Sequence, residues 1–135
     1  KDFKEKGIRM MLNFGHTFAH ALEIKNKYSN QLNHGEAVLV GMFIATKISK
    51  FKNLCSKNTF KQIEDLYIDN SLIKNFEKFL RKKEILKSIK FMQNDKKKDD
   101  EKVSFVFLKK LGKTTIPGKF KYKVDQIENL IKQLF

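Results

Sequence analysis

The hydrophobic residues near the N-terminus recur with the period of an α-helix. Between Ile8 and Leu22 they fall three and four positions apart, with Gly15 in the same stripe. The members of this stripe are Ile8, Met11, Leu12, Phe18, Ala19 and Leu22. The spacing predicts one amphipathic helix that begins near Ile8 and continues past Leu22.

A second helix is predicted over residues 34–51, HGEAVLVGMFIATKISKF. The polar residues 26–33, NKYSNQLN, precede it as a loop, and Asn33 has the side chain of a helix cap. The first half of this helix is apolar on nearly all sides, which predicts a central position in the fold. Gly41 lacks a side chain, so we expect a neighbouring element to pack closely against it.

The remaining residues predict shorter helices and a small hairpin. Amphipathic patterns over residues 58–68 and 72–89 indicate helices with lysine on their outer faces. Residues 103–113 and 119–124 are rich in β-branched and aromatic side chains, and turn residues lie between them. A final helix is expected over residues 125–135 with Asp125 as its cap. The predicted fold class is mainly α, a bundle-like helical domain with a small β-hairpin near the C-terminus.

Length and composition favour a single domain over residues 1–135. The chain has 135 residues, of which 41% are hydrophobic, enough to bury one core. Its longest apolar run is far shorter than a membrane span, so no membrane partner is expected. The charged start KDFKEKGIR does not resemble a signal peptide. A lone cysteine, Cys55, excludes an internal disulfide and fits a reducing, cytoplasmic location.

The strong positive charge raises the alternative of a basic module that binds nucleic acid. The net charge is +14 and the isoelectric point is near 9.8. However, the lysines are spread over several elements, Arg9 and Arg81 are the only arginines, and the phenylalanines fall at core spacing. These features favour a biased composition, so we expect no nucleic-acid partner.

The first predicted helix carries a polar stripe that contains no lysine. At about 100° per residue, its members lie within an arc of about 80°. They are Arg9, Asn13, His16, His20 and Glu23. A solvated helix face in this protein would contain lysine, whereas these side chains bind ligands or donate hydrogen bonds. Residues 28–46 also lack lysine.

All three histidines of the chain lie in the two lysine-free windows. His16 and His20 stand four apart, and His34 opens the second predicted helix. The simplest interpretation of such a pair is two solvated or hydrogen-bonded rings. Imidazole is, however, a preferred ligand of zinc, and lysines nearby would repel the ion. We therefore expect a divalent metal between the two helices, with Glu23 or Glu36 as carboxylate options.

Three motifs in this order resemble the C-terminal half of the 3-dehydroquinate synthase family. They are GIRMMLNFGHTFAHALE, LNHGEAVLVGM and NDKKKDDEKVSFVFLKKLGK, and the resemblance extends from residue 2 to about residue 113. It implies a divalent metal, usually zinc and alternatively cobalt, held by His16 and His34 together with a glutamate from the preceding part of the enzyme. It also implies that His20 is not a ligand and contacts the substrate instead.

The resemblance further implies residues that bind the substrate, the seven-carbon keto-acid phosphate DAHP. Arg9 and Asn13 match positions that bind its charged ends, and Glu5 matches an acidic residue near its hydroxyls. In the DKK motif, Lys96 is the preferred contact, with Lys97 as the alternative register. A solvated lysine run is the competing interpretation of this motif.

The implied reaction converts DAHP to 3-dehydroquinate and phosphate in the shikimate pathway, with NAD recycled. NAD is held by an N-terminal domain of the family, and the present sequence has no glycine-rich dinucleotide motif. We therefore expect that domain to be absent from this chain, the isolated chain to be inactive, and the complete enzyme to be a homodimer.

Two alternative enzyme classes share the family's fold. One is a related sugar-phosphate cyclase, and the other is an iron-type dehydrogenase. Dehydrogenases lack the combined Arg, Asn and DKK set, so they are disfavoured.

Overall fold

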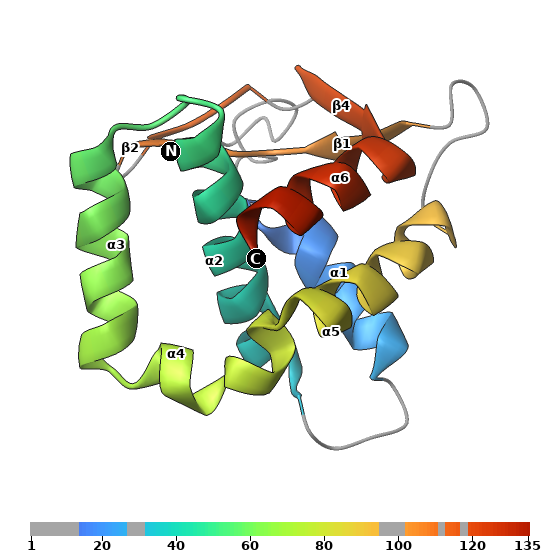
Figure 1. Cartoon of the computed structure of the whole chain (residues 1–135), viewed down its shortest axis with the longest axis horizontal. Helices are drawn as coiled ribbons and strands as arrows, with labels where there is room; N and C mark the ends of the chain where they lie inside the picture. The colour runs from blue at the N-terminus through green and yellow to red at the C-terminus, as the bar shows by residue number, and fades with distance from the viewer. Residues whose placement is uncertain (1–13, 27–31, 95–101, 111–112, 117–118) are drawn as a thin grey trace, which may run out of the picture.

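The structure is a computed structural model that describes residues 14–26, 32–94, 102–110, 113–116 and 119–135. The described part is mainly helical, with short antiparallel strands near the C-terminus, as the sequence predicted (Figure 1). Its α-helices are α1 (His16–Lys25), α2 (His34–Phe51), α3 (Lys57–Asp69), α4 (Leu72–Asn75), α5 (Lys82–Ile89) and α6 (Val124–Leu134). Two 3-10 helices, η2 (Glu77–Leu80) and η3 (Lys90–Asn94), flank α5.

Helix α2 is the centre of the core, which confirms the prediction from its apolar pattern. It lies between α3 on one side and α1 on the other (Figure 1). Val40, Ile44 and Ile48 are completely or almost completely buried. Asn33 caps the helix as expected: its side chain accepts the Glu36 N–H at 2.8 Å, and the Glu36 carboxylate accepts the Asn33 N–H at 2.9 Å.

Helix α1 begins at His16, so the prediction of one continuous helix from Ile8 is wrong at Gly15. Gly15 has φ +78°, a left-handed conformation that no residue inside an α-helix adopts. The backbones are close here, because a Cβ on Gly41 would lie 2.3 Å from the Gly15 oxygen. A Cβ on Gly15 would lie 2.7 Å from the backbone of Met42. The close packing expected at Gly41 is confirmed, and it explains why the chain turns at Gly15.

The predicted helix over residues 72–89 is divided into three pieces. Phe76 separates α4 from η2, and Arg81, with an extended backbone, separates η2 from α5. Phe76 and Phe79 are both buried.

The C-terminal strands form two small antiparallel pairs, one nested inside the other. β1 (Lys102–Phe105) pairs with β4 (Phe120–Lys123), and β2 (Leu108–Lys110) pairs with β3 (Lys113–Thr114). The predicted hairpin is thus confirmed in outline. Phe105 and Phe107 are buried and stack with ring centroids 5.8 Å apart.

Helix α6 begins one residue earlier than predicted, at Val124. Its N-cap is Lys123, whose backbone N–H donates to Gln126 Oε1 at 2.8 Å. Asp125 is therefore not the cap. It lies in the first turn, where its carboxylate interacts favourably with the helix dipole. Ile127 and Ile131 bury this helix against the core. Among the described helices, none combines the length and apolar character that a membrane crossing requires.

Candidate functional site

His16 and His34 lie side by side, although 17 residues stand between them in the sequence. His16 is the first residue of α1 and His34 is the first residue of α2. Their ring centroids are 6.4 Å apart and their planes meet at 68°. The two lysine-free windows of the sequence therefore meet in the folded chain.

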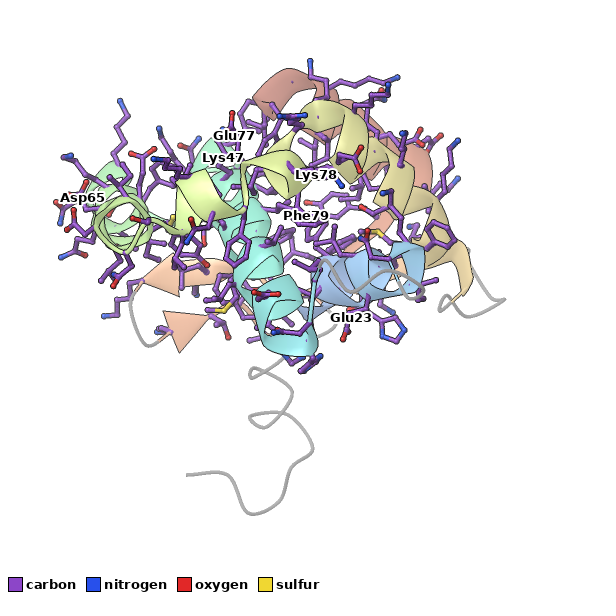
Figure 2. All side chains as sticks on the ribbon, turned by 90° about the horizontal axis from the view of Figure 1, so that it is seen from below. Glu23, Lys47, Asp65, Glu77, Lys78 and Phe79 are labelled. Atoms are coloured by element: carbon purple, nitrogen blue, oxygen red, sulfur yellow. The ribbon has the colours of Figure 1, made fainter. Side chains whose placement is uncertain are left out.

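Helix α1 runs in the opposite sense to α2, and this direction determines which side chains meet. Gly15 at the start of α1 contacts Gly41 in the middle of α2, and Glu23 in the last turn of α1 reaches His34 at the start of α2. Glu23 projects from α1 on the side away from α5 and α6 (Figure 2). Measured over the described residues, His34 is exposed and His16 is half-buried.

Glu23 holds the ring of His34 in place. Its Oε2 lies 2.8 Å from Nδ1 of His34. A carboxylate only accepts hydrogen bonds, so Nδ1 carries the proton of this bond and Nε2 of the neutral ring keeps a lone pair. The His34 side chain is 71% exposed, so that lone pair is accessible. Sequence reasoning treated Glu23 as a carboxylate option for the metal and missed this orienting contact.

The two imidazoles fit two positions of a metal site. Rings that share one tetrahedral zinc have centroids about 5 Å apart, given Zn–N bonds of about 2.0–2.1 Å. The observed centroid distance of 6.4 Å is longer than this value. The described residues contain no group of three His, Cys, Asp or Glu side chains placed for one ion. His16 and His34 by themselves therefore do not make a three-ligand site among the described residues.

Glu36 and His20 occupy different places from the histidine pair. The Glu36 carboxylate is engaged in the cap of α2 through the Asn33 N–H, so it has a structural role at this helix start. His20 lies one turn beyond His16 on α1 and is exposed. The structure brings His16 beside His34, and the exclusion of His20 from the metal ligands stays a prediction.

The family model for the C-terminal part of 3-dehydroquinate synthase matches residues 1–98 of this chain. The chain belongs to the 3-dehydroquinate synthase family. The resemblance seen in the three motifs is thereby confirmed. The matched range contains both histidines of the pair, Glu23, and the segment with the DKK motif.

Curated 3-dehydroquinate synthases are similar over most of this chain. The protein from Pelagibacter ubique (strain HTCC1062) is 42% identical over 122 residues, which cover 90% of this chain and 33% of the relative. The protein from Endomicrobium trichonymphae is 43% identical over 114 residues, covering 84% of this chain and 30% of the relative. The chain spans about a third of the length of the relatives it matches.

A solved structure from a neighbouring class shares the fold. A crystal structure of 2-deoxy-scyllo-inosose synthase, complexed with carbaglucose-6-phosphate, NAD+ and Co2+, has a TM-score of 0.74. Its sequence is 22% identical, and the match covers 100% of this chain and 36% of that chain. The predicted fold class of a dehydroquinate synthase-like C-terminal domain is therefore confirmed.

The remaining substrate residues expected from the 3-dehydroquinate synthase family lie outside the described residues. They are Glu5, Arg9, Asn13, Lys96 and Lys97. The structure does describe the residues on either side of the DKK segment. η3, which precedes the segment, packs against α1. On its other side, Ser104 of β1 accepts a hydrogen bond at 2.9 Å from the hydroxyl of Thr17, the neighbour of His16.

Thr17 is a residue that sequence reasoning missed. Its contact joins positions 87 apart in the sequence, and neither periodicity nor any motif signals a contact of that range. The bond attaches the helix of His16 directly to the strand that follows the DKK segment.

Proposed function

We propose that this chain is the metal- and substrate-binding domain of a 3-dehydroquinate synthase, which converts DAHP to 3-dehydroquinate and phosphate. Membership of the family supports the reaction class. The observation that carries the proposal is the proximity of His16 and His34, with His34 oriented by Glu23. Two imidazoles held by packed helices supply two of the three protein ligands that a catalytic zinc or cobalt ion commonly takes.

In this proposal, His16 and His34 hold the metal, and a glutamate from the preceding part of the enzyme completes its protein ligands. When bound, the metal supplies Lewis-acid polarisation of the substrate oxygen at the carbon to be oxidised. Glu23 keeps the Nε2 lone pair of His34 available, as the carboxylate partners of metal-bound histidines do in general. The segments 9–23 and 28–46, which carry the two histidines, contain no lysine and so contribute no ammonium group that would repel the ion.

The other family positions orient the substrate. We assign His20, together with Lys96 or Lys97, to the hydroxyl and phosphate groups, because each donates hydrogen bonds or positive charge. Arg9 and Asn13 bind the charged ends, where a guanidinium fork suits a carboxylate, and Glu5 contacts the hydroxyls. This assignment is supported by the packing of η3 against α1 and by the hydrogen bond from Thr17 to Ser104 of β1, which bring both described flanks of the DKK motif to the helix of His16. Holding a flexible seven-carbon acid in one geometry is the main contribution of such residues.

NAD is assigned to the part of the relatives that this chain does not span. The chain covers about a third of the curated relatives, and NAD+ is bound in the 2-deoxy-scyllo-inosose synthase crystal structure. We therefore propose that the complete enzyme is a cytoplasmic homodimer whose N-terminal domain holds NAD, and that this chain alone does not release phosphate from DAHP. An isolated chain that turns over DAHP would contradict this division of roles.

The test uses the full-length protein with NAD, DAHP and added zinc or cobalt. His16→Ala and His34→Ala are expected to lose bound metal and activity together, as measured by metal analysis after gel filtration and by phosphate release. His20→Ala is expected to retain metal and lose turnover. A metal-free His20→Ala protein, or a metal-loaded His34→Ala protein, would refute the assignment of ligands.

A related sugar-phosphate cyclase is the second candidate function, because such an enzyme shares the fold. The two are distinguished by substrate. A synthase of the shikimate reaction releases phosphate from DAHP and not from glucose 6-phosphate. The higher identity to curated 3-dehydroquinate synthases favours the first candidate.

A further inference from the structure

A cavity of about 570 Å³ lies at the opposite end of α2 from His34. It is bounded by the end of α2, the turn that follows, the start of α3 and strand β2. Its lining residues are Lys50, Asn53, Leu54, Cys55, Ser56, Lys57, Thr59, Lys109 and Lys110. The volume is in the range of sites that hold small molecules. Lys50 lies 16 residues after His34 on the same helix, so the cavity is about 24 Å from the histidine pair.

The cavity concentrates positive charge without any carboxylate. Four of its lining residues are lysines, and none is Asp or Glu. Among the ion pairs of the described residues, none involves these four lysines. Burial raises the pKa of the Cys55 thiol, which keeps this side chain neutral. A concave surface with several unneutralised ammonium groups has a positive potential that an anion would relieve.

The local structure of β2 and α2 brings these lysines to the same cavity. β2 is irregular between Leu108 and Lys110, and this shift in register allows two consecutive lysines to line the same cavity. The ammonium group of Lys50 lies 4.6 Å from the centre of the Phe60 ring, which restrains that side chain. The Leu108 N–H donates to Ser49 Oγ at 3.0 Å and fastens β2 to α2.

The start of α3 brings the positive end of a helix to the same cavity. Ser56 caps this 13-residue helix by accepting the Thr59 N–H at 3.0 Å. Lys57 and Thr59, in its first turn, both line the cavity. The positive end of a helix favours a phosphate group, and here it coincides with the lysines and a formed cavity.

We propose that this cavity binds the phosphate group of a small organic phosphate, at a site separate from the histidine pair. Lys109 and Lys110 on β2 face the phosphate from one side, and Lys57 with the first turn of α3 faces it from the other. The apolar side chain of Leu54 and the thiol of Cys55 bound the space for the organic part. The inference does not depend on the proposed synthase activity.

The test is a titration of the isotope-labelled chain with inorganic phosphate and with glycerol 3-phosphate, at constant ionic strength, followed by amide chemical shifts. Saturable shifts are expected at Lys57, Asn58 and Thr59. In the double variant Lys109→Gln, Lys110→Gln the dissociation constant is expected to rise by about tenfold, because two charged partners are lost. Shifts that rise without saturation would overturn the proposal.

A matched variant separates this site from the general charge of the protein. Lys119→Gln with Lys121→Gln removes the same charge at exposed positions that do not line the cavity. This variant is expected to bind phosphate within about twofold of the original chain. Equal weakening by both double variants would refute a specific site. Lys57→Gln serves as a second probe if changes on β2 disturb the fold, and unchanged binding in that variant would also refute it.

Discussion

Nδ1 of His34 donates to Oε2 of Glu23 across 2.8 Å, and this bond joins the first residue of α2 to the last turn of α1. Glu23→Ala removes the acceptor that fixes the ring and its tautomer. We expect metal affinity in the full-length protein to fall by about tenfold or more, as the loss of such partners does elsewhere. Cobalt titration followed by the visible spectrum measures this change.

Glu77→Ala is the control for Glu23→Ala, since Glu77 is an exposed carboxylate on η2 (Figure 2). It is expected to leave cobalt affinity unchanged. Nitrogen chemical shifts of the metal-free protein report the tautomer of His34 directly. A His34 that already carries its proton on Nε2 in the unchanged protein would show that Glu23 does not orient it.

Gly41→Ala is expected to destabilise the fold by about 2 kcal/mol or more. The added Cβ would lie 2.3 Å from the Gly15 oxygen and 2.9 Å from the Ala19 nitrogen, both backbone atoms of α1 and its cap. The helices must separate to accept it. Urea unfolding measures the loss, and the same variant should weaken metal binding because the histidines move apart.

Gly35→Ala is the matched control on the same helix. The nearest atom to its new Cβ is Asn33 Oδ1 at 3.6 Å, an ordinary contact. Alanine is a better helix former than glycine, so stability should rise by up to about 1 kcal/mol. If the two alanine variants destabilise equally, the close packing at Gly41 is not responsible.

Asn33→Ala removes the cap that precedes His34. We expect a loss of about 1 kcal/mol in the free energy of unfolding and weaker metal binding, because the first turn of α2 frays. Ser56→Ala removes the corresponding cap of α3. It should cost a similar free energy without changing metal affinity, and a loss of affinity in that variant would contradict a local effect at His34.

Glu84 makes stability depend on pH in the acidic range. Its hydrogen bond from Lys25, at 2.8 Å, together with the positive charge of nearby lysines, lowers the pKa of this carboxyl below its ordinary 4.5. A lowered folded-state pKa stabilises the protein above the unfolded value, and this stabilisation is lost as the pH falls through the folded value. Glu84→Gln should therefore cost about 1 kcal/mol at pH 7.

The difference between Glu84→Gln and the original chain should shrink as the pH falls below 4.5. Urea unfolding at pH 7 and at pH 3 measures it. Asp65→Asn is the control, since its partner Lys61 is on the same exposed helix face, and little effect is expected at either pH. If Glu84→Gln lowers the free energy of unfolding by the same amount at both pH values, the charge of Glu84 does not contribute to stability.

The elements that the sequence predicted best are those whose signals are local. Asn33 and Glu36 form a cap that three residues of sequence define, and the apolar run of α2 has no alternative to burial. The start of α1 directly after Gly15 was not predictable, because a glycine in a helical pattern fits either inside the helix or at its start. Only the approach of Gly41 decides between these positions.

In the candidate site, too, the sequence predicted local features and missed contacts that depend on how the helices pack. The motifs pointed to His16 and His34, and the structure places their rings together. The orienting role of Glu23 depends on the direction in which α1 crosses α2, which no periodicity reports. Likewise, the bends at Phe76 and Arg81 contain neither Gly nor Pro, so nothing in the local sequence marks them.

The sequence distances of these contacts have a consequence for folding order. Gly15 meets Gly41 and Glu23 meets His34 within one short stretch of chain, whereas Thr17 meets Ser104 across 87 positions. Contacts between residues that are near in the sequence form faster than contacts between residues that are far apart. We therefore expect the histidine pair to assemble early during synthesis, and the strand that follows the DKK segment to dock last.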